Sequence, residues 1–170
     1  MSKTTKSIIT LSAICLIIAV ILAGVNYITA PIIKEAEDNA TREALREVYP
    51  AGNAFDVVDL SEYGEISESV NEVYRADDGG FVVKLTTTGY ASGMVILCGV
   101  DPEGRVTGSV CIASSETLGY EKTYGASLVD KDKKAVAEAD TVSGATKTTG
   151  AYRAAVELAI ETAEILKGGK

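Results

Sequence analysis

The sequence predicts an α+β protein: one N-terminal transmembrane helix, then a single small domain in which helices flank an antiparallel sheet. Three observations lead to this prediction. Residues 7–30 contain no charged side chain, residues 72–113 alternate β-branched segments with turn sequences, and residues 149–166 repeat apolar side chains at helical spacing. A chain of 170 residues suits one compact domain plus an appendage.

The composition excludes several kinds of chemistry. The chain has no histidine, which removes Ser-His-Asp and Cys-His catalysis, c-type haem ligation and most zinc sites. Its three cysteines form no Cys-x-x-Cys pair, so iron–sulfur spacing is absent too. A net charge of −8 argues against a nucleic-acid partner. We expect no metal site and no catalytic residue of the chain's own, so redox chemistry would need an organic cofactor.

Residues 7–30 are long enough for a helix that crosses a bilayer. Lys3 and Lys6 precede this segment and acidic residues follow it, so the positive-inside rule predicts a cytoplasmic N-terminus at residues 1–6. The main domain would then be extracytoplasmic, with the anchor in contact with membrane lipid.

Two other interpretations of this segment are weaker. A cleaved signal peptide has a shorter apolar core, and Asn26 and Tyr27 stand where small residues should mark the cleavage site. Cys15 follows Ile14 rather than a small residue, and the apolar segment continues beyond it. We therefore interpret Cys15 as a side chain that faces the membrane, not as a lipid attachment site.

Residues 31–50 predict an amphipathic helix that links the anchor to the domain. Pro31 is expected to end or kink the membrane span, and Pro50 to stop the linking helix. Between the two prolines, apolar residues recur at spacings of three and four: Ile33, Ala36, Ala40, Ala44, Leu45 and Val48.

Residues 51–170 form the predicted domain, with four or five antiparallel strands as its core. Residues 72–76 and 81–89 flank the turn sequence 77–80, and residues 94–100 and 105–113 flank the turn sequence 101–104. Residues 56–60 suggest a further short strand. Cys98 and Cys111 fall on the two arms of the second hairpin, where a disulfide and separate buried thiols are both consistent with the sequence.

Residues 127–139 suggest a short helix, and residues 149–166 predict a long final one. Asp130 and Asp132 begin like a calcium loop, but Lys134 and Ala135 stand where an acidic ligand and a glycine are required. The sequence therefore argues against calcium.

The segment most suggestive of chemistry precedes that final helix and reads Asp140-Thr-Val-Ser-Gly-Ala-Thr-Lys-Thr-Thr-Gly150. In one interpretation, Thr148 or Thr149 only caps the helix. In the other, the amides and the positive dipole end of the helix receive a phosphate, and Gly144 and Ala145 let it approach the backbone.

Asp140-Thr-Val-Ser-Gly-Ala-Thr146 resembles the flavinylation motif of the FMN-binding domains in two kinds of complex. These are the G subunit of Rnf electron-transport complexes and the C subunit of sodium-pumping quinone reductases. The resemblance extends over nearly the whole chain, in the same order, through these segments: the anchor, Thr29-Ala-Pro31, Ala44-Leu45, Gly89-Tyr90, Gly99-Val-Asp and Ser115-Glu116-Thr117.

The resemblance implies a covalent flavin. In that family, a separate flavin transferase moves the FMN part of FAD onto the threonine that closes the Ser-Gly-Ala-Thr tetrad, which here is Thr146. Thr148 is the alternative acceptor. Further cofactor-binding residues are expected in the motif and in the Ser-Glu-Thr segment, the latter beside the flavin ring or simply in a turn: Asp140, Ser143, Gly144, Ala145, Glu116 and Thr117.

Aromatic residues near these segments are candidates to stack on the flavin or to pack ordinarily: Tyr90, Tyr120 and Tyr124. The chain departs from the family pattern in two places. Leu118-Gly119-Tyr120-Glu121 replaces an expected Pro-Gly-Leu-Gly, and the segment from residue 124 to residue 140 is shorter than the pattern predicts. Both departures fall near the expected flavin site.

The resemblance also implies a function: an electron-carrier subunit of an ion-translocating ferredoxin:NAD oxidoreductase, rather than a stand-alone enzyme. Its partners would be the other membrane subunits of the complex and the flavin transferase. Two alternatives stay open. One is an FMN-binding protein of another extracytoplasmic electron-transfer chain, and the other is an anchored binding or scaffold module without redox chemistry.

Overall fold

The computed structural model describes residues 3–64 and 66–168, which form two units, Met1–Ala40 and Thr41–Lys170. Helix α1, Lys3–Val48, begins in the first unit and ends in the second. Within it, Leu11–Pro31 is long and apolar enough to cross a membrane. The sequence allows Pro31 to end or to kink the span: the apolar segment ends at Pro31, whereas the helix continues through it to Val48. A proline inside a helix removes one backbone hydrogen bond.

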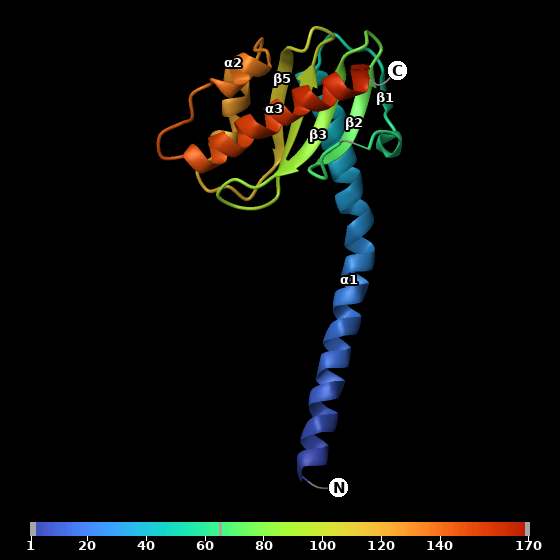
Figure 1. The fold of residues 1–170 in the computed structure, drawn as a ribbon. Helices are drawn as coiled ribbons and strands as arrows, with labels where there is room; N and C mark the ends of the chain where they lie inside the picture. The colour runs from blue at the N-terminus through green and yellow to red at the C-terminus, as the bar shows by residue number, and fades with distance from the viewer. Residues whose placement is uncertain (1–2, 65, 169–170) are drawn as a thin grey trace. The chain divides into compact units, whose positions relative to one another are not determined.

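The second unit contains a five-stranded antiparallel sheet, as the sequence predicts (Figure 1). Its strands are β1 Phe55–Val57, β2 Val70–Ala76, β3 Phe81–Thr87, β4 Met94–Val100 and β5 Val106–Ala113. Each strand pairs with the next one in the chain, in the order β1-β2-β3-β4-β5. The sheet is therefore a simple meander.

Helix α3, Thr146–Gly168, lies across one face of this sheet (Figure 1). Its buried side chains pack on the inward-facing residues of the central strands and form the larger core of the domain. The fully buried contributors from the helix include Tyr152, Val156, Ala159 and Ile160, and those from the strands include Val83, Leu85, Ile96 and Cys98. This face supplies most of the apolar burial that stabilises the fold.

The last turns of α1 cover part of the opposite face. Ala44, Leu45, Val48 and Tyr49 form a second buried cluster with Ala76, Val82 and Leu97 of the sheet. Ala44, Leu45 and Val48, three of the apolar residues at helical spacing, are thus buried. The side chains of Ile33, Ala36 and Ala40 lie outside the described part of the chain.

Two glycines of the sheet allow the C-terminal end of α1 to pack closely against it. Gly99 and Gly108 face each other across β4 and β5. A Cβ atom added at Gly108 would lie 2.7 Å from the Val48 Cα, and one added at Gly99 would lie 2.5 Å from the Val48 carbonyl oxygen. The Thr107 hydroxyl donates to that carbonyl over 2.6 Å. The C-terminal end of α1 is therefore closely packed, and its last carbonyl has a partner.

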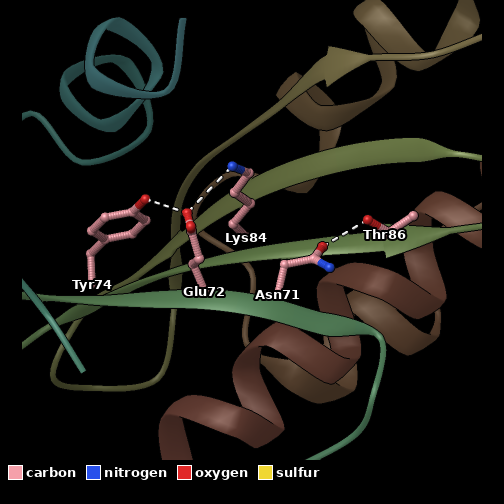
Figure 2. Close-up of polar contacts among 5 residues, drawn as sticks. All are labelled: Asn71, Glu72, Tyr74, Lys84 and Thr86. Atoms are coloured by element: carbon pink, nitrogen blue, oxygen red, sulfur yellow. Dashed lines mark hydrogen bonds and ion pairs between the residues drawn. The ribbon is translucent and has the colours of Figure 1, made fainter. Parts of the chain in front are cut away.

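Polar contacts hold the β2–β3 hairpin in register (Figure 2). Glu72 and Lys84 are opposed across the two strands, and the Glu72 carboxylate lies 3.3 Å from the Lys84 ammonium. The Tyr74 hydroxyl donates to the same carboxylate over 2.6 Å and lowers the pKa of Glu72. Asn71 sits where the register shifts, and its side chain accepts a hydrogen bond from Thr86 over 2.7 Å. The two cross-strand contacts, Glu72–Lys84 and Asn71–Thr86, add to the stability of the hairpin.

Two elements, a helix and a strand, are shorter than the sequence predicts. Residues 127–139 contain one α-helical segment, α2 Lys133–Ala137, preceded by the 3-10 helix Tyr124–Leu128. The predicted strand at residues 56–60 is β1, and a 3-10 turn at Leu60–Glu62 follows it. Asp132 accepts a hydrogen bond from the Ala135 amide and caps α2. This aspartate therefore has a structural role.

Candidate functional site

A cavity of about 420 Å³ opens at the N-terminal end of α3. It brings together residues from three separate segments, the loop after β3, the loop after β5 and the start of α3. The lining residues are Tyr90, Glu116, Thr117, Leu118, Gly144, Ala145, Thr146, Lys147 and Thr148. Glu116 and Thr117, which the sequence relates to the tetrad only through a resemblance, thus lie beside it in space.

The start of α3 is where the sequence prediction needs correction. The helix begins at Thr146 rather than Thr149, so Thr146 is its first residue and not a residue ahead of it. Ala145, just before the helix, has no side-chain oxygen to cap the first turn. No described residue accepts a hydrogen bond from the amides of Thr146, Lys147 and Thr148. Three amide donors are therefore available to an anion at the mouth of the cavity.

Gly144 makes this helix start possible through its conformation. Its φ of +84° lies in the left-handed region, which side chains rarely adopt. A Cβ added there would meet nothing within 4 Å. Ala145 is buried, and it lines the cavity together with Gly144. Gly144 thus shapes the turn through its conformation.

The three threonines of the first turn have different environments. The Thr146 hydroxyl is exposed, and no described residue forms a hydrogen bond with it. Thr148 donates to the Glu116 carboxylate over 2.6 Å. Thr149 donates to the Ala145 carbonyl and accepts from the Val142 amide. The prediction that Thr148 or Thr149 caps the helix is therefore wrong, since both lie within it and bond elsewhere.

Glu116 joins two walls of the cavity. One carboxylate oxygen accepts the Ala91 amide over 2.9 Å, and the other accepts the Thr148 hydroxyl. A Cβ added at Gly89 would lie 2.5 Å from the first of these oxygens. No local pattern in the sequence indicates this contact, because its members are separated by 25 and 32 residues.

The outer walls of the cavity are apolar and exposed. Tyr90 is 73% exposed and Leu118 is 65% exposed, although both are large hydrophobic side chains. Lys147 contributes a cation that no described carboxylate neutralises. Sequence reasoning selected Tyr90 but missed Leu118 and Lys147. Leu118 falls in the segment that departs from the family pattern, which was the one available signal.

Four other residues singled out from the sequence do not line the cavity: Asp140, Ser143, Tyr120 and Tyr124. The Tyr124 hydroxyl donates to the Asp140 carbonyl over 2.8 Å, and its ring packs edge-on against Tyr152. Burial raises the pKa of Tyr124. Tyr124 and the Asp140 backbone therefore brace the loop that leads to the tetrad.

The cysteines in the described part of the chain are free thiols. Cys98 and Cys111 are not opposed across β4 and β5, because Cys98 pairs with Ser109 and Cys111 with Ile96. Burial raises the pKa of Cys98 to about 12 and that of Cys111 to about 11. Within the described residues, no group of three acidic or sulfur ligands is placed to hold a metal ion.

The cavity is suited to a ligand with a phosphate at one end and an apolar ring at the other. Its volume lies in the range of about 300–1,000 Å³ that cofactor and ligand sites occupy. Free amides and Lys147 at the start of α3 suit the phosphate, and Tyr90 and Leu118 suit the ring. The fold and the site thus define a small α+β domain of the kind that binds a phosphate-bearing aromatic cofactor.

Comparison with known proteins specifies the family. Residues 89–161 match the model of the FMN-binding domain, and residues 1–48 match that of the RnfG N-terminal region. The chain is 31% identical to the G subunit of the Na(+)-translocating ferredoxin:NAD(+) oxidoreductase complex of Acetobacterium woodii, over 81% of this chain and 73% of that protein. It belongs to the family of Rnf complex G subunits, as the resemblance indicates.

A second relative covers more of the chain at lower identity. It is the G subunit of the proton-translocating ferredoxin:NAD(+) oxidoreductase complex of Clostridium ljungdahlii, which is 25% identical over 94% of this chain and 91% of its own length. The names of the two relatives specify different ions, so similarity to them does not indicate an ion for this chain.

Proposed function

We propose that this protein is the FMN-carrying electron-transfer subunit of an Rnf-type ferredoxin:NAD oxidoreductase complex. Family membership and the match to the FMN-binding domain support the electron-transfer role. The cavity at the start of α3 supports it further, because it lies within the residues that match that domain. Bound FMN would supply the electron chemistry, while the protein supplies its binding and surroundings.

FMN is attached in this proposal through a phosphoester to Thr146. The observation that carries it is the difference among the threonines of the first turn. Thr146 has an exposed hydroxyl without a partner among the described residues, whereas the hydroxyls of Thr148 and Thr149 are engaged within the protein. An enzyme that must reach an acceptor oxygen would meet Thr146 first. Thr148 remains the alternative acceptor, and its bond to Glu116 argues against it.

The attachment reaction balances as a phosphoryl transfer. The Thr146 oxygen attacks the phosphorus on the FMN side of FAD and forms a new P–O bond. The bond from that phosphorus to the bridging oxygen breaks, AMP leaves, and the hydroxyl proton passes to solvent. A flavin transferase, as an external enzyme, provides the FAD.

Within the site, the residues of this chain have separate tasks. The amides of Thr146, Lys147 and Thr148, with the positive end of α3, stabilise the phosphodiester. Tyr90 and Leu118 cover the apolar ring, and Thr117 lies in the same wall. Asp140 and Ser143 are outside the lining, and their contact with the cofactor remains a prediction.

The anchor is the other part of the proposal. Leu11–Pro31 is long and apolar enough to cross the membrane. In this proposal it crosses the membrane once, in contact with lipid and with the other subunits of the complex. Lys3 and Lys6 place the N-terminus in the cytoplasm and the flavin domain outside. A covalent bond is useful there, because flavin that dissociated would be diluted beyond recovery.

The orientation can be tested with two single-cysteine variants. Gly168→Cys should react with a membrane-impermeant thiol reagent in intact cells, and Thr4→Cys should react only after lysis. The reverse pattern would contradict the orientation without affecting the attachment site.

The attachment is tested by intact mass after co-expression with a flavin transferase. Wild type should gain the mass of FMN less one water. Thr146→Ala should gain nothing, while Thr146→Ser, which retains the acceptor oxygen, should still be modified. Loss of the adduct in Thr148→Val, with retention in Thr146→Ala, would move the site to Thr148.

A second candidate function is supported by the departure from the family pattern. Glu121 is buried there, with one oxygen bonded to the Ser114 hydroxyl and the other without a partner among the described residues. Of the changed segment, Leu118 lines the cavity, and such a change is consistent with an FMN protein of another extracytoplasmic chain. Reduction of the flavin by ferredoxin in membranes with the remaining Rnf subunits, and not without them, would exclude this alternative. A colourless wild type would favour the scaffold module.

A further inference from the structure

We propose that Glu116 is a positioning residue: its carboxylate holds the first turn of α3 in place so that the Thr146 hydroxyl can accept the flavin. This inference rests on the proposed function, since it assigns a role in the attachment reaction. It differs from the expectation that Glu116 contacts the flavin ring.

The geometry of the carboxylate supports a bracing role. One oxygen accepts the Ala91 amide over 2.9 Å and the other accepts the Thr148 hydroxyl over 2.6 Å. We call these two hydrogen bonds the Glu116 bridge. Both oxygens face protein groups, so a direct contact with the flavin would need to share or break one of these bonds.

The bridge is closely packed on the side of the β3–β4 loop. The Gly89 amide donates to the Ala91 carbonyl over 3.1 Å and closes the turn there. A Cβ added at Gly89 would lie 2.5 Å from the Glu116 carboxylate and 3.1 Å from the Thr148 Cα. The loop, the carboxylate and the helix therefore meet without space for another side chain, and movement of one requires movement of the others.

The first turn of α3 is also held on a second side. Thr149 donates to the Ala145 carbonyl over 3.0 Å and accepts the Val142 amide over 3.1 Å. These contacts tie the turn to the segment before it, whereas the Glu116 bridge ties it to the opposite wall. Thr146 lies in the turn between these two supports, and its own hydroxyl is free of them.

Electrostatics makes the bridge stronger than an ordinary pair of hydrogen bonds. A hydrogen bond to a carboxylate is charge-assisted, and the N-terminal end of a helix stabilises a negative charge. Fixing an acceptor group can change a transfer rate by about a hundredfold, because an error of about 1 Å in its position disturbs the reacting geometry.

The test uses the full-length protein in detergent, a purified flavin transferase and FAD. The initial rate of FMN addition is followed by intact mass, and hydrogen exchange of the bonded amides of Gly89, Ala91 and Thr149 is measured before modification. Glu116→Ala removes the bridge. Glu116→Gln retains it without the charge, because the amide can accept from Ala91 and donate to Thr148. Glu138→Ala, at an exposed position, is the control.

Glu116→Ala should slow the addition by roughly tenfold or more and raise hydrogen exchange both in the loop, at Gly89 and Ala91, and in the helix, at Thr149, with a cooperative melt retained. Glu116→Gln should recover most of the rate, and Glu138→Ala should resemble wild type. Thr148→Val should be slowed like Glu116→Ala, and the double variant should be slowed little further, because both changes break the same bridge.

The outcomes separate this inference from the proposed function. If wild type is modified and Glu116→Ala is modified equally fast, the positioning role is wrong and the attachment site stands. If Glu116→Gln is as slow as Glu116→Ala, a side chain that can form both hydrogen bonds does not restore the rate, and the inference is overturned. If wild type gains no FMN, both proposals fail.

Discussion

Glycines have different roles at two helix ends of the domain, the C-terminal end of α1 and the N-terminal end of α3. At the C-terminal end of α1, Gly99 and Gly108 admit the Val48 backbone, and Thr107 donates to its carbonyl. At the N-terminal end of α3, Gly144 shapes the turn, but the first amides and the Thr146 hydroxyl have no partners among the described residues. The C-terminal end of α1 is closely packed and hydrogen-bonded, whereas the N-terminal end of α3 keeps free donors, as a helix end suited to an anion does.

Of the changes that test this comparison, removing the C-terminal end of α1 should have the largest effect on the stability of the domain. A fragment that begins at Ala36 retains Ala44, Leu45, Val48 and Tyr49, while one that begins at Asn53 loses them. Fully buried large side chains contribute about 1.5–3 kcal/mol each, and a domain is stable by about 5–15 kcal/mol in total. The longer fragment should melt cooperatively without flavin, and the shorter one should not. Circular dichroism during heating measures both, and equal melting temperatures would show that the α1 end is not part of the core.

Two glycine variants should sharpen the contrast. Gly108→Ala would place a Cβ 2.7 Å from the Val48 backbone, so we expect a loss of about 1–3 kcal/mol with normal flavin addition at low temperature. Gly144→Ala meets no atom but retains an unfavourable φ, which costs about 1–2 kcal/mol. Because that residue shapes the turn before Thr146, flavin addition should fall too. Denaturant melts and intact mass give the two readouts; equal flavin addition in both variants would contradict the contrast.

The same substitution at two threonines provides a more direct comparison. Thr107→Val leaves the Val48 carbonyl without its donor, which should cost about 1–3 kcal/mol and leave flavin addition unchanged. Thr146→Val removes an exposed hydroxyl that bonds no described residue, so stability should stay within about 0.5 kcal/mol while flavin addition is lost. Urea unfolding followed by fluorescence or circular dichroism, with intact mass, measures both effects. A strongly destabilised Thr146→Val would mean that this end is structural as well.

The smallest expected effect is a pH dependence of stability, which comes from Cys98 in the core beneath α3. Burial raises the pKa of Cys98 from 9.0 to about 12, so the folded state retains a thiol proton that the unfolded chain releases. Stability from this group is complete below pH 9 and falls as the pH rises toward 12, by about 1 kcal/mol at pH 10. Cys98→Ala should therefore lose less stability between pH 8 and pH 10 than wild type. Parallel curves in urea melts would contradict this assignment.

The fold was largely predictable because its signals are local. Turn sequences at residues 77–80 and 101–104 separate β-branched segments, and consecutive strands pair without crossovers. The start of α3 was misjudged by three residues, since Gly144 and Ala145 provide the turn without a polar cap. Of the two outcomes expected at Pro31, an end or a kink, the helix does not end there, because a proline removes only one hydrogen bond from a long helix.

The candidate site was predictable only in part. The tetrad and Glu116 came from a motif, but the contact between Glu116 and Thr148 depends on how the β5 loop packs on α3. Leu118 and Lys147 carry no motif, and their exposure beside the cavity is a property of the fold. Register and loop packing over 25 to 32 residues are set by the tertiary structure, which local patterns do not encode.

The meander of the sheet bears on the order in which the protein matures. Contacts between consecutive strands are near in sequence, whereas α3 follows all five strands in the chain. The Glu116 bridge cannot close until α3 has docked on strands already in place. An acceptor that depends on this docking would be absent from the nascent chain, so the flavin would mark only molecules that had completed folding.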